Sequence, residues 1–268
     1  MVGERSLRTV VFIHGLWMHA STWDPWVALF KEQGYDAINP PWPGEGVTVA
    51  ESRANPESVA GVGVKQIADS YANVIASLDQ PPILIGHSFG GLIAQELLGR
   101  GIAAGAVAID PAPIKGVWQL PFSALRVASV ALRNPANRNR AVSLTYDQFR
   151  YGFTNVIDET EARELFERCT IPSPAKPLFQ AASSTFNRKA ETRVDTANAT
   201  RGPLLLMSGG RDHTVPPVLV TSTLKRYANS SAVTELQSFP DRGHSLTIDH
   251  GWQEIADASL AWLRKQGL

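Results

Sequence analysis

The segment ILIGHSFGGLIAQELL, residues 83–98, constrains the fold more than any other part of the chain. A short apolar, β-rich run passes into a helix-like run, and Ser88 lies between them. Gly86 and Gly90 flank this serine two residues away on either side, where a Cβ would collide with neighbouring backbone in a sharp strand-to-helix turn. The pattern G-x-S-x-G also occurs by chance, but this context predicts that Ser88 projects from the edge of a sheet at a helix N-terminus, where it can act as a nucleophile.

Short β-rich runs alternate with helix-length segments along most of the chain. The expected strands are 9–13, 36–39, 83–85, 106–109, 203–207 and 233–239. The expected helices are 22–33, with Ser21 as N-cap, then 59–78, 89–98, 217–227 and 252–263. Strands that are apolar on both faces and separated by helices indicate an α/β fold with a mainly parallel sheet covered by helices on both sides.

Residues 111–200 interrupt this alternation. They contain no convincing strand, but helix-like pieces at Phe122–Arg133 and Glu159–Cys169 with proline-rich joints. This segment has 12 basic and 8 acidic residues, a net charge of +4, so the rest of the chain has −4. We therefore expect a core made of residues 1–110 and 201–268, with residues 111–200 as a mostly helical insertion.

Composition excludes several classes of protein. The 268 residues are 44% hydrophobic, which is typical of a folded globular chain, and the net charge of zero disfavours nucleic-acid binding. The single cysteine, Cys169, cannot form an internal disulfide or build a zinc site. Met1–Arg8 is too polar for a signal segment, and no apolar run approaches the ~18 residues of a membrane span, so we expect a cytoplasmic protein without a membrane span.

A serine nucleophile needs a base, and the base needs an acid that orients it. His244 follows the last expected strand, and Asp212 follows the strand before it. Parallel strands would place both loops at the same edge of the sheet as Ser88. Asp110 also ends a strand and is an alternative acid, but the glycine-rich approach to Asp212 favours Asp212.

Stabilising a tetrahedral oxyanion requires two backbone N–H groups aimed at one point. Phe89, the residue after the candidate nucleophile, supplies one of them. The loop His14-Gly15-Leu16 ends the first expected strand, where Gly15 allows close approach and Leu16 supplies the second donor. The histidines show no metal-ligand spacing, so no metal site is expected.

These motifs resemble the α/β-hydrolase superfamily over nearly the whole chain. The H-G motif at His14, G-x-S-x-G-G, D-x-x-V-P at Asp212 and G-H-S at His244 occur in the family order, and residues 41–46 resemble the family's P-G-x-G loop. The resemblance implies a catalytic triad of Ser88, Asp212 and His244, no cofactor, and a cap domain at residues 111–200. The antiparallel strands that begin many family members have no counterpart before residue 9, which predicts about six strands.

The expected activity is hydrolysis of a carboxylic ester of a small to medium apolar substrate through an acyl-enzyme. Amides, thioesters and lactones share this route. A cofactor-free lyase resembling hydroxynitrile lyases, a perhydrolase and a non-catalytic small-molecule receptor are the alternatives on this fold. Aromatic residues predicted to line the substrate pocket are Trp17, Trp118, Phe122, Phe149, Phe153 and Phe179.

Overall fold

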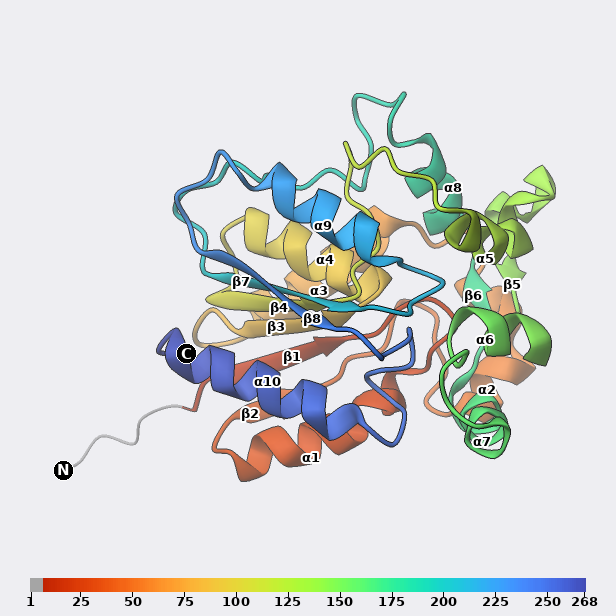
Figure 1. The fold of residues 1–268 in the computed structure, drawn as a ribbon, viewed down its shortest axis with the longest axis horizontal. Coiled ribbons are helices and arrows are strands. Elements are labelled where there is room, and N and C mark those ends of the chain that lie inside the picture. The colour runs from red at the N-terminus through yellow and green to blue at the C-terminus, as the bar shows by residue number, and fades with distance from the viewer. Residues whose placement is uncertain (1–6) are drawn as a thin grey trace.

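A six-stranded sheet forms the centre of the computed structural model, which describes residues 7–268 (Figure 1). Across the sheet the strands are β2 (Asp36–Ile38), β1 (Thr9–Ile13), β3 (Ile83–His87), β4 (Gly105–Ile109), β7 (Leu204–Gly209) and β8 (Thr234–Phe239). Each neighbouring pair is parallel, so the carboxyl ends of all six strands lie at one edge. The predicted α/β fold with about six mainly parallel strands is confirmed.

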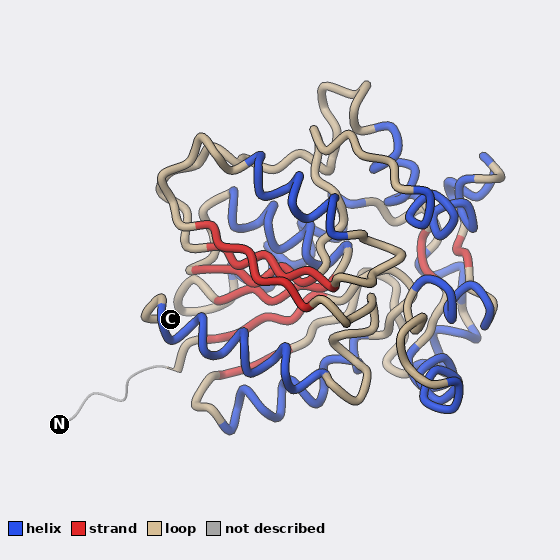
Figure 2. Tube along the Cα trace, viewed as in Figure 1, coloured by secondary structure: helices blue, strands red, loops and turns tan. Residues whose placement is uncertain are grey.

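Helices cover both faces of this sheet (Figure 2). On one face lie α1 (Asp24–Glu32) and α10 (Trp252–Lys265), and on the other α3 (Val64–Ala76), α4 (Phe89–Gly99) and α9 (Pro217–Arg226). Alternate side chains of each strand point to opposite faces, so the sheet has two apolar cores. In β1, Val10 and Phe12 join the core with α1 and α10, whereas Val11 and Ile13 join the core with α3, α4 and α9.

The chain between β4 and β7 carries its helices beyond the carboxyl edge of the sheet, and after the last of them it returns past the C-terminal end of α4 to β7 (Figure 1). Its helices are α5 (Phe122–Leu132), α6 (Tyr146–Gly152), α7 (Glu159–Cys169) and α8 (Lys176–Ser183), with the 3₁₀ turn η3 (Pro135–Asn139). It also contains a short antiparallel pair, β5 (Ala141–Val142) with β6 (Ser173–Pro174), which the sequence pattern did not indicate. A two-residue strand is too short to leave a periodic signal. Whether this segment is a separate cap domain stays a prediction.

Two predicted helix starts are wrong. Ser21 does not cap α1: the 3₁₀ turn η1 (Ala20–Trp23) precedes that helix, and the side chain of His19 accepts the N–H of Ser21. The predicted helix 59–78 begins only at Val64, after α2 (Val49–Ala54) and η2 (Pro56–Val59). In both cases the apolar pattern extends through a short turn, so periodicity places the helix start too early.

Among residues 7–268, no helix is both long and apolar enough to cross a membrane. Most of the polar stretch Met1–Arg8, on which the expectation about a signal segment rests, lies outside the described residues. The cytoplasmic location stays a prediction.

Candidate active site

Ser88 lies at a strained turn between β3 and α4. Its backbone has φ 55° and ψ −121°, a combination that a non-glycine residue rarely adopts. A Cβ at Gly86 would lie 2.2 Å from the carbonyl oxygen of Gly90, and one at Gly90 would lie 2.0 Å from that of Ile13. Only glycine fits at either position, so the predicted sharp strand-to-helix turn is present at Ser88.

Asp212 and His244 form a buried pair at the same edge of the sheet. Nδ1 of His244 lies 2.5 Å from Oδ2 of Asp212, and neither side chain is exposed. Oδ1 of Asp212 accepts the N–H groups of Thr214 at 2.6 Å and Val215 at 2.8 Å. These donors fix the carboxylate, and the carboxylate fixes the imidazole ring.

The other ring nitrogen of His244, Nε2, has no hydrogen-bond partner among the described residues. The ring of His87, the residue before Ser88, lies 4.5 Å from the His244 ring. Burial and the neighbouring His244 hold the pKa of His87 well below its ordinary value, so His87 is a neutral packing partner. Nε2 of His244 therefore makes no hydrogen bond to the hydroxyl of Ser88 in this structure. Catalytic hydrogen bonds are often long or poorly aligned before a substrate binds.

Asp110, the alternative acid, lies close to His87 and His244. It follows β4, is fully buried, and has a positive φ of 39°. Its Oδ1 accepts the N–H of Gly209 at 2.7 Å, while Nδ1 of His244 is bonded to Asp212. Of the two acids, Asp212 is therefore the one in direct contact with the imidazole.

His87, Asp110 and His244 each place one donor atom within 4.8 Å of the others. This is a set of side chains of the type that binds metals. Two of its members, however, already make hydrogen bonds within the protein: Oδ1 of Asp110 accepts the N–H of Gly209, and Nδ1 of His244 is bonded to Asp212. We therefore do not identify these residues as metal ligands. We interpret the cluster as buried side chains that pack against the Asp212–His244 pair.

Two backbone N–H groups beside Ser88 have no acceptor among residues 7–268. They belong to Leu16, in the loop after β1, and to Phe89, the first residue of α4. Both residues line the same cavity as Ser88. A Cβ at Gly15 would lie 2.8 Å from that of Ser88, so glycine is what allows the Leu16 loop to approach the serine.

Glu45 supports the Leu16 loop, a role that the sequence analysis did not assign. Its carboxylate lies 2.8 Å from Nε2 of His14 and accepts the N–H of Ala20 at 2.7 Å. The ring of Trp42 stacks on that of His14 at 4.7 Å. Burial alone would raise the pKa of Glu45, but the charge and hydrogen bond of His14, the N–H of Ala20 and the charge of His19 together lower that pKa below its ordinary value.

Trp17 connects the Leu16 loop to the inserted segment. Its backbone has φ 65°, its N–H donates to Oγ of Ser173 at 2.6 Å, and its indole N–H donates to the carbonyl of Val142 at 2.9 Å. Backbone bonds from His19 to Cys169 and from Ile171 to Trp17 continue this contact. The short strands β5 and β6 thus contact the Leu16 loop through Trp17.

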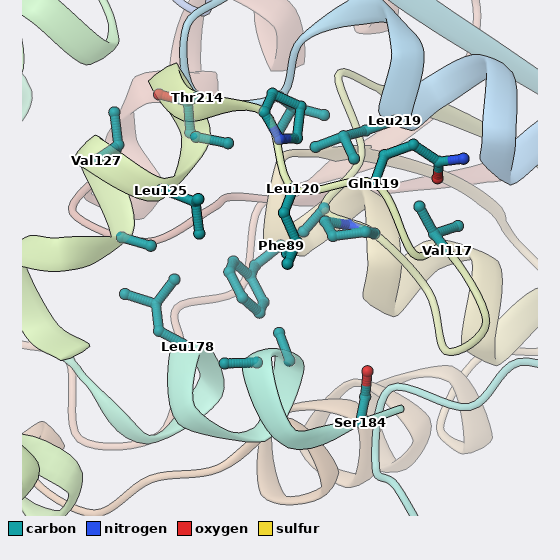
Figure 3. A pocket seen from close by; sticks show the side chains of 18 of the residues that line it. Phe89, Val117, Gln119, Leu120, Leu125, Val127, Leu178, Ser184, Thr214 and Leu219 are labelled. Carbon is teal, nitrogen blue, oxygen red and sulfur yellow. The ribbon is translucent and has the colours of Figure 1, made fainter. Parts of the chain in front are cut away.

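An apolar cavity of about 280 Å³ opens beside Ser88 (Figure 3). Phe89 points into it from α4, facing Leu125 of α5 and Leu178 of α8, and the largely exposed Leu120 also lines it. Of the six aromatic residues predicted to line the pocket, the structure places Trp17 and Trp118 in its wall.

The other four predicted aromatic residues lie elsewhere. Phe149 and Phe153 are fully buried and stack on each other, and the Phe153 ring packs against Trp17 and lies 4.8 Å from the His244 ring. Phe122 is 79% exposed, and Phe179 is half-buried on α8. Aliphatic residues of α5, α8 and the loop before α5 form most of the wall instead. Their sequence pattern did not distinguish them from ordinary core residues.

The site combines a serine at a sharp strand-to-helix turn of a parallel sheet with an Asp–His pair at the same edge of that sheet. This arrangement is typical of α/β hydrolases. Residues 10–258 match the model of the alpha/beta hydrolase family, and the chain belongs to that family. No curated protein sequence matches the chain.

Solved structures with the same fold include several esterases and lipases. A monoacylglycerol lipase from Paleococcus ferrophilus is 21% identical, with a TM-score of 0.69 over 96% of this chain and 94% of that one. An extracellular α/β-hydrolase from a Paenibacillus species is 21% identical, with a TM-score of 0.68 over 95% and 98%. An Arabidopsis methylesterase is 16% identical, with a TM-score of 0.65 over 96% and 99%. At these identities the likeness establishes the fold.

Proposed function

We propose that the chain is a serine hydrolase that cleaves carboxylic esters of small to medium, largely apolar substrates through an acyl-enzyme. The observation that supports this most directly is the buried Asp212–His244 pair at the same sheet edge as the strained Ser88 turn. The apolar cavity beside Ser88 supports the choice of substrate. Solved structures with the same fold that are named as a lipase and an esterase are consistent with the proposed activity.

In the proposed first step, Nε2 of His244 takes the proton of Ser88 and the serine oxygen attacks the ester carbonyl. Asp212 holds the proton on Nδ1 and stabilises the imidazolium that forms. The N–H groups of Leu16 and Phe89 donate to the tetrahedral oxyanion, which costs little reorganisation because neither has another acceptor within the described part of the chain.

Collapse of this intermediate returns the proton from His244 to the leaving alcohol. A water molecule then enters, His244 takes one of its protons, and the resulting hydroxide attacks the acyl-enzyme. Ser88 regains its proton when the carboxylic acid leaves. The residues named require no cofactor for either half-reaction.

A fluorophosphonate probe and a plain ester together test the proposal. The wild-type protein is expected to be labelled at Ser88 and to release alcohol in a burst before steady turnover. Ser88→Ala is expected to abolish labelling and to lose ~10⁴–10⁶ in kcat. Its melting temperature should stay near that of the wild type.

The same experiment separates the alternatives. A receptor with a sealed pocket would not react with the probe. A lyase would react without a burst of alcohol from a plain ester. Ester turnover by Ser88→Ala within tenfold of wild type would contradict the assignment of the nucleophile.

A further inference from the structure

Asp110 occupies a second strained turn directly beside that of Ser88. Its φ is 39°, and the backbone around it is bonded to the serine on both sides: Ser88 N–H donates to Ile109, and Ala112 N–H donates to Ser88. The N–H of Asp110 donates to the carbonyl of Met207 in β7. A strained, fully buried acid that links three strand ends is costly to maintain unless the site uses it.

The side chain of Asp110 is not solvated as a charged carboxylate would need to be. Oδ1 accepts one hydrogen bond, from the N–H of Gly209, and no donor group of the described residues reaches Oδ2. The titratable groups around it are Asp212 after β7, His244 after β8 and His87 of β3, and among residues 7–268 no lysine or arginine forms an ion pair with it. Burial first, and then the charge and contact of Asp212, raise the pKa of Asp110 well above its ordinary value.

Both carboxylate oxygens of Asp212, in contrast, accept hydrogen bonds. It has the N–H groups of Thr214 and Val215 on one oxygen and Nδ1 of His244 on the other. Two carboxyl groups in one dry pocket cannot both ionise, and the group with more donors retains the negative charge. In this pair that group is Asp212.

We propose that Asp110 is a positioning residue, held as a neutral carboxylic acid that donates its proton to the Asp212 carboxylate beneath His244. This inference rests on the proposed function, since it concerns the same serine site. The proton stays on Asp110 throughout the reaction. The O–H···O⁻ hydrogen bond fixes Asp212 against His244 and withdraws part of its charge, so that His244 stays neutral, and able to act as a base, at lower pH.

The substitution Asp110→Asn distinguishes a neutral acid from a charged one. An asparagine is neutral and keeps both the acceptor for Gly209 and a donor for Asp212. We expect Asp110→Asn to react with fluorophosphonate within about threefold of the wild-type rate, and the acid limb of its pH–rate profile to stay in place. Asp110→Ala removes the donor, and its acid limb is expected to move up by about one pH unit.

Asp241→Asn is the matched control. Asp241 lies three residues before His244 but is exposed, so loss of its charge is screened by solvent and should leave the acid limb unchanged. If Asp110→Asn moves the acid limb to lower pH, or is as slow as Asp212→Asn, Asp110 is charged and the proposal is wrong. It is equally wrong if Asp110→Ala folds and matches the wild type in rate and pH profile.

Infrared spectroscopy tests the proton without any measurement of activity. The difference spectrum of wild type minus Asp110→Asn near neutral pH is expected to contain the carbonyl stretch of a protonated carboxyl group. The same band should be found when the difference is taken in the Ser88→Ala background. Its absence would overturn the proposal even if Asp110→Ala fails to fold. A protein that shows the band but is not labelled at Ser88 would refute the proposed function and leave the assignment of the proton intact.

Discussion

At the scale of single residues, the candidate site depends on which acid contacts the imidazole. The sequence places Asp110 and Asp212 at equivalent strand ends, and the choice of Asp212 rested on the glycines before it. In the structure Asp212 is bonded to His244, whereas Asp110 is bonded to the backbone of Gly209. The two acids thus differ in which groups donate hydrogen bonds to their carboxylates. Those donors come from other parts of the chain, so the local sequence does not predict them.

Asp212→Asn is expected to reduce kcat by about 10⁴, because an amide that donates to Nδ1 holds His244 in the tautomer that cannot accept the serine proton. The measurement is single-turnover hydrolysis of a plain ester, with a thermal melt to show that the variant folds. Thr214 and Val215 still have an amide oxygen to donate to. A loss of less than tenfold would mean that Asp212 is only a turn residue.

At the scale of elements, the strand–turn–helix around Ser88 follows from sequence because everything it needs is local. The apolar strand, the two glycines and the helix lie within residues 83–98. The strands β5 and β6 were not predicted, because long-range contacts stabilise them: Trp17 bonds to Ser173 and Val142, more than a hundred residues away. The helices α6 and α8 were also missed, although the capping box of Thr145 and Gln148 that begins α6 is a local signal. The position of Glu45 beneath the Leu16 loop has the same long-range origin.

Glu45→Gln is expected to destabilise the protein by about 1–3 kcal/mol at neutral pH, because it removes the charge that His14 faces in a dry site. The folded state lowers the pKa of Glu45, so its contribution is present above the unfolded-state pKa and is lost as pH falls through the folded one. The difference in urea midpoint between variant and wild type should therefore shrink below about pH 4.

Glu51→Gln serves as the control, since Glu51 is an exposed acid that bonds only to its own turn. It should leave both the midpoint and its pH dependence nearly unchanged. A Glu45→Gln midpoint that differs from wild type equally at neutral and acid pH would show that the Glu45 charge is not what stabilises the loop.

At the scale of the whole molecule, the inserted segment and the core together enclose the cavity. Its wall takes Leu16 and Phe89 from the core, and Leu125 and Leu178 from the segment. Sequence analysis placed the large aromatic residues there, but Phe153 packs against Trp17 and His244 instead, and Phe149 stacks on Phe153. Large side chains fill space between layers, so aliphatic ones are left to line what remains open.

The charge of the segment bears on which substrates enter. Lys115 and Arg193 of the segment and Arg226 of α9 line a recess whose wall includes Trp118, and Trp118 also lines the apolar cavity. These side chains reach solvent, where charges separated by more than ~8–10 Å are screened. We therefore expect the cavity, rather than the net charge of +4 on residues 111–200, to determine specificity.

A series of C2 to C16 acyl esters of one alcohol, measured at two salt concentrations, tests this. A cavity of about 280 Å³ accommodates a short acyl chain, with apolar walls that gain free energy for each methylene until the cavity is full. The expected result is a maximum of kcat/KM at C4–C8 with little salt dependence, and a narrower cavity in Ala181→Leu should move that maximum to shorter chains. A steady rise of kcat/KM up to C16, with activation at a lipid–water interface, would instead indicate a lipase whose substrate extends past Leu120 into solvent. Once the cavity is full, further methylenes gain no binding free energy inside it. A steep loss of kcat/KM with salt would indicate that the recess at Lys115 binds an anionic part of the substrate.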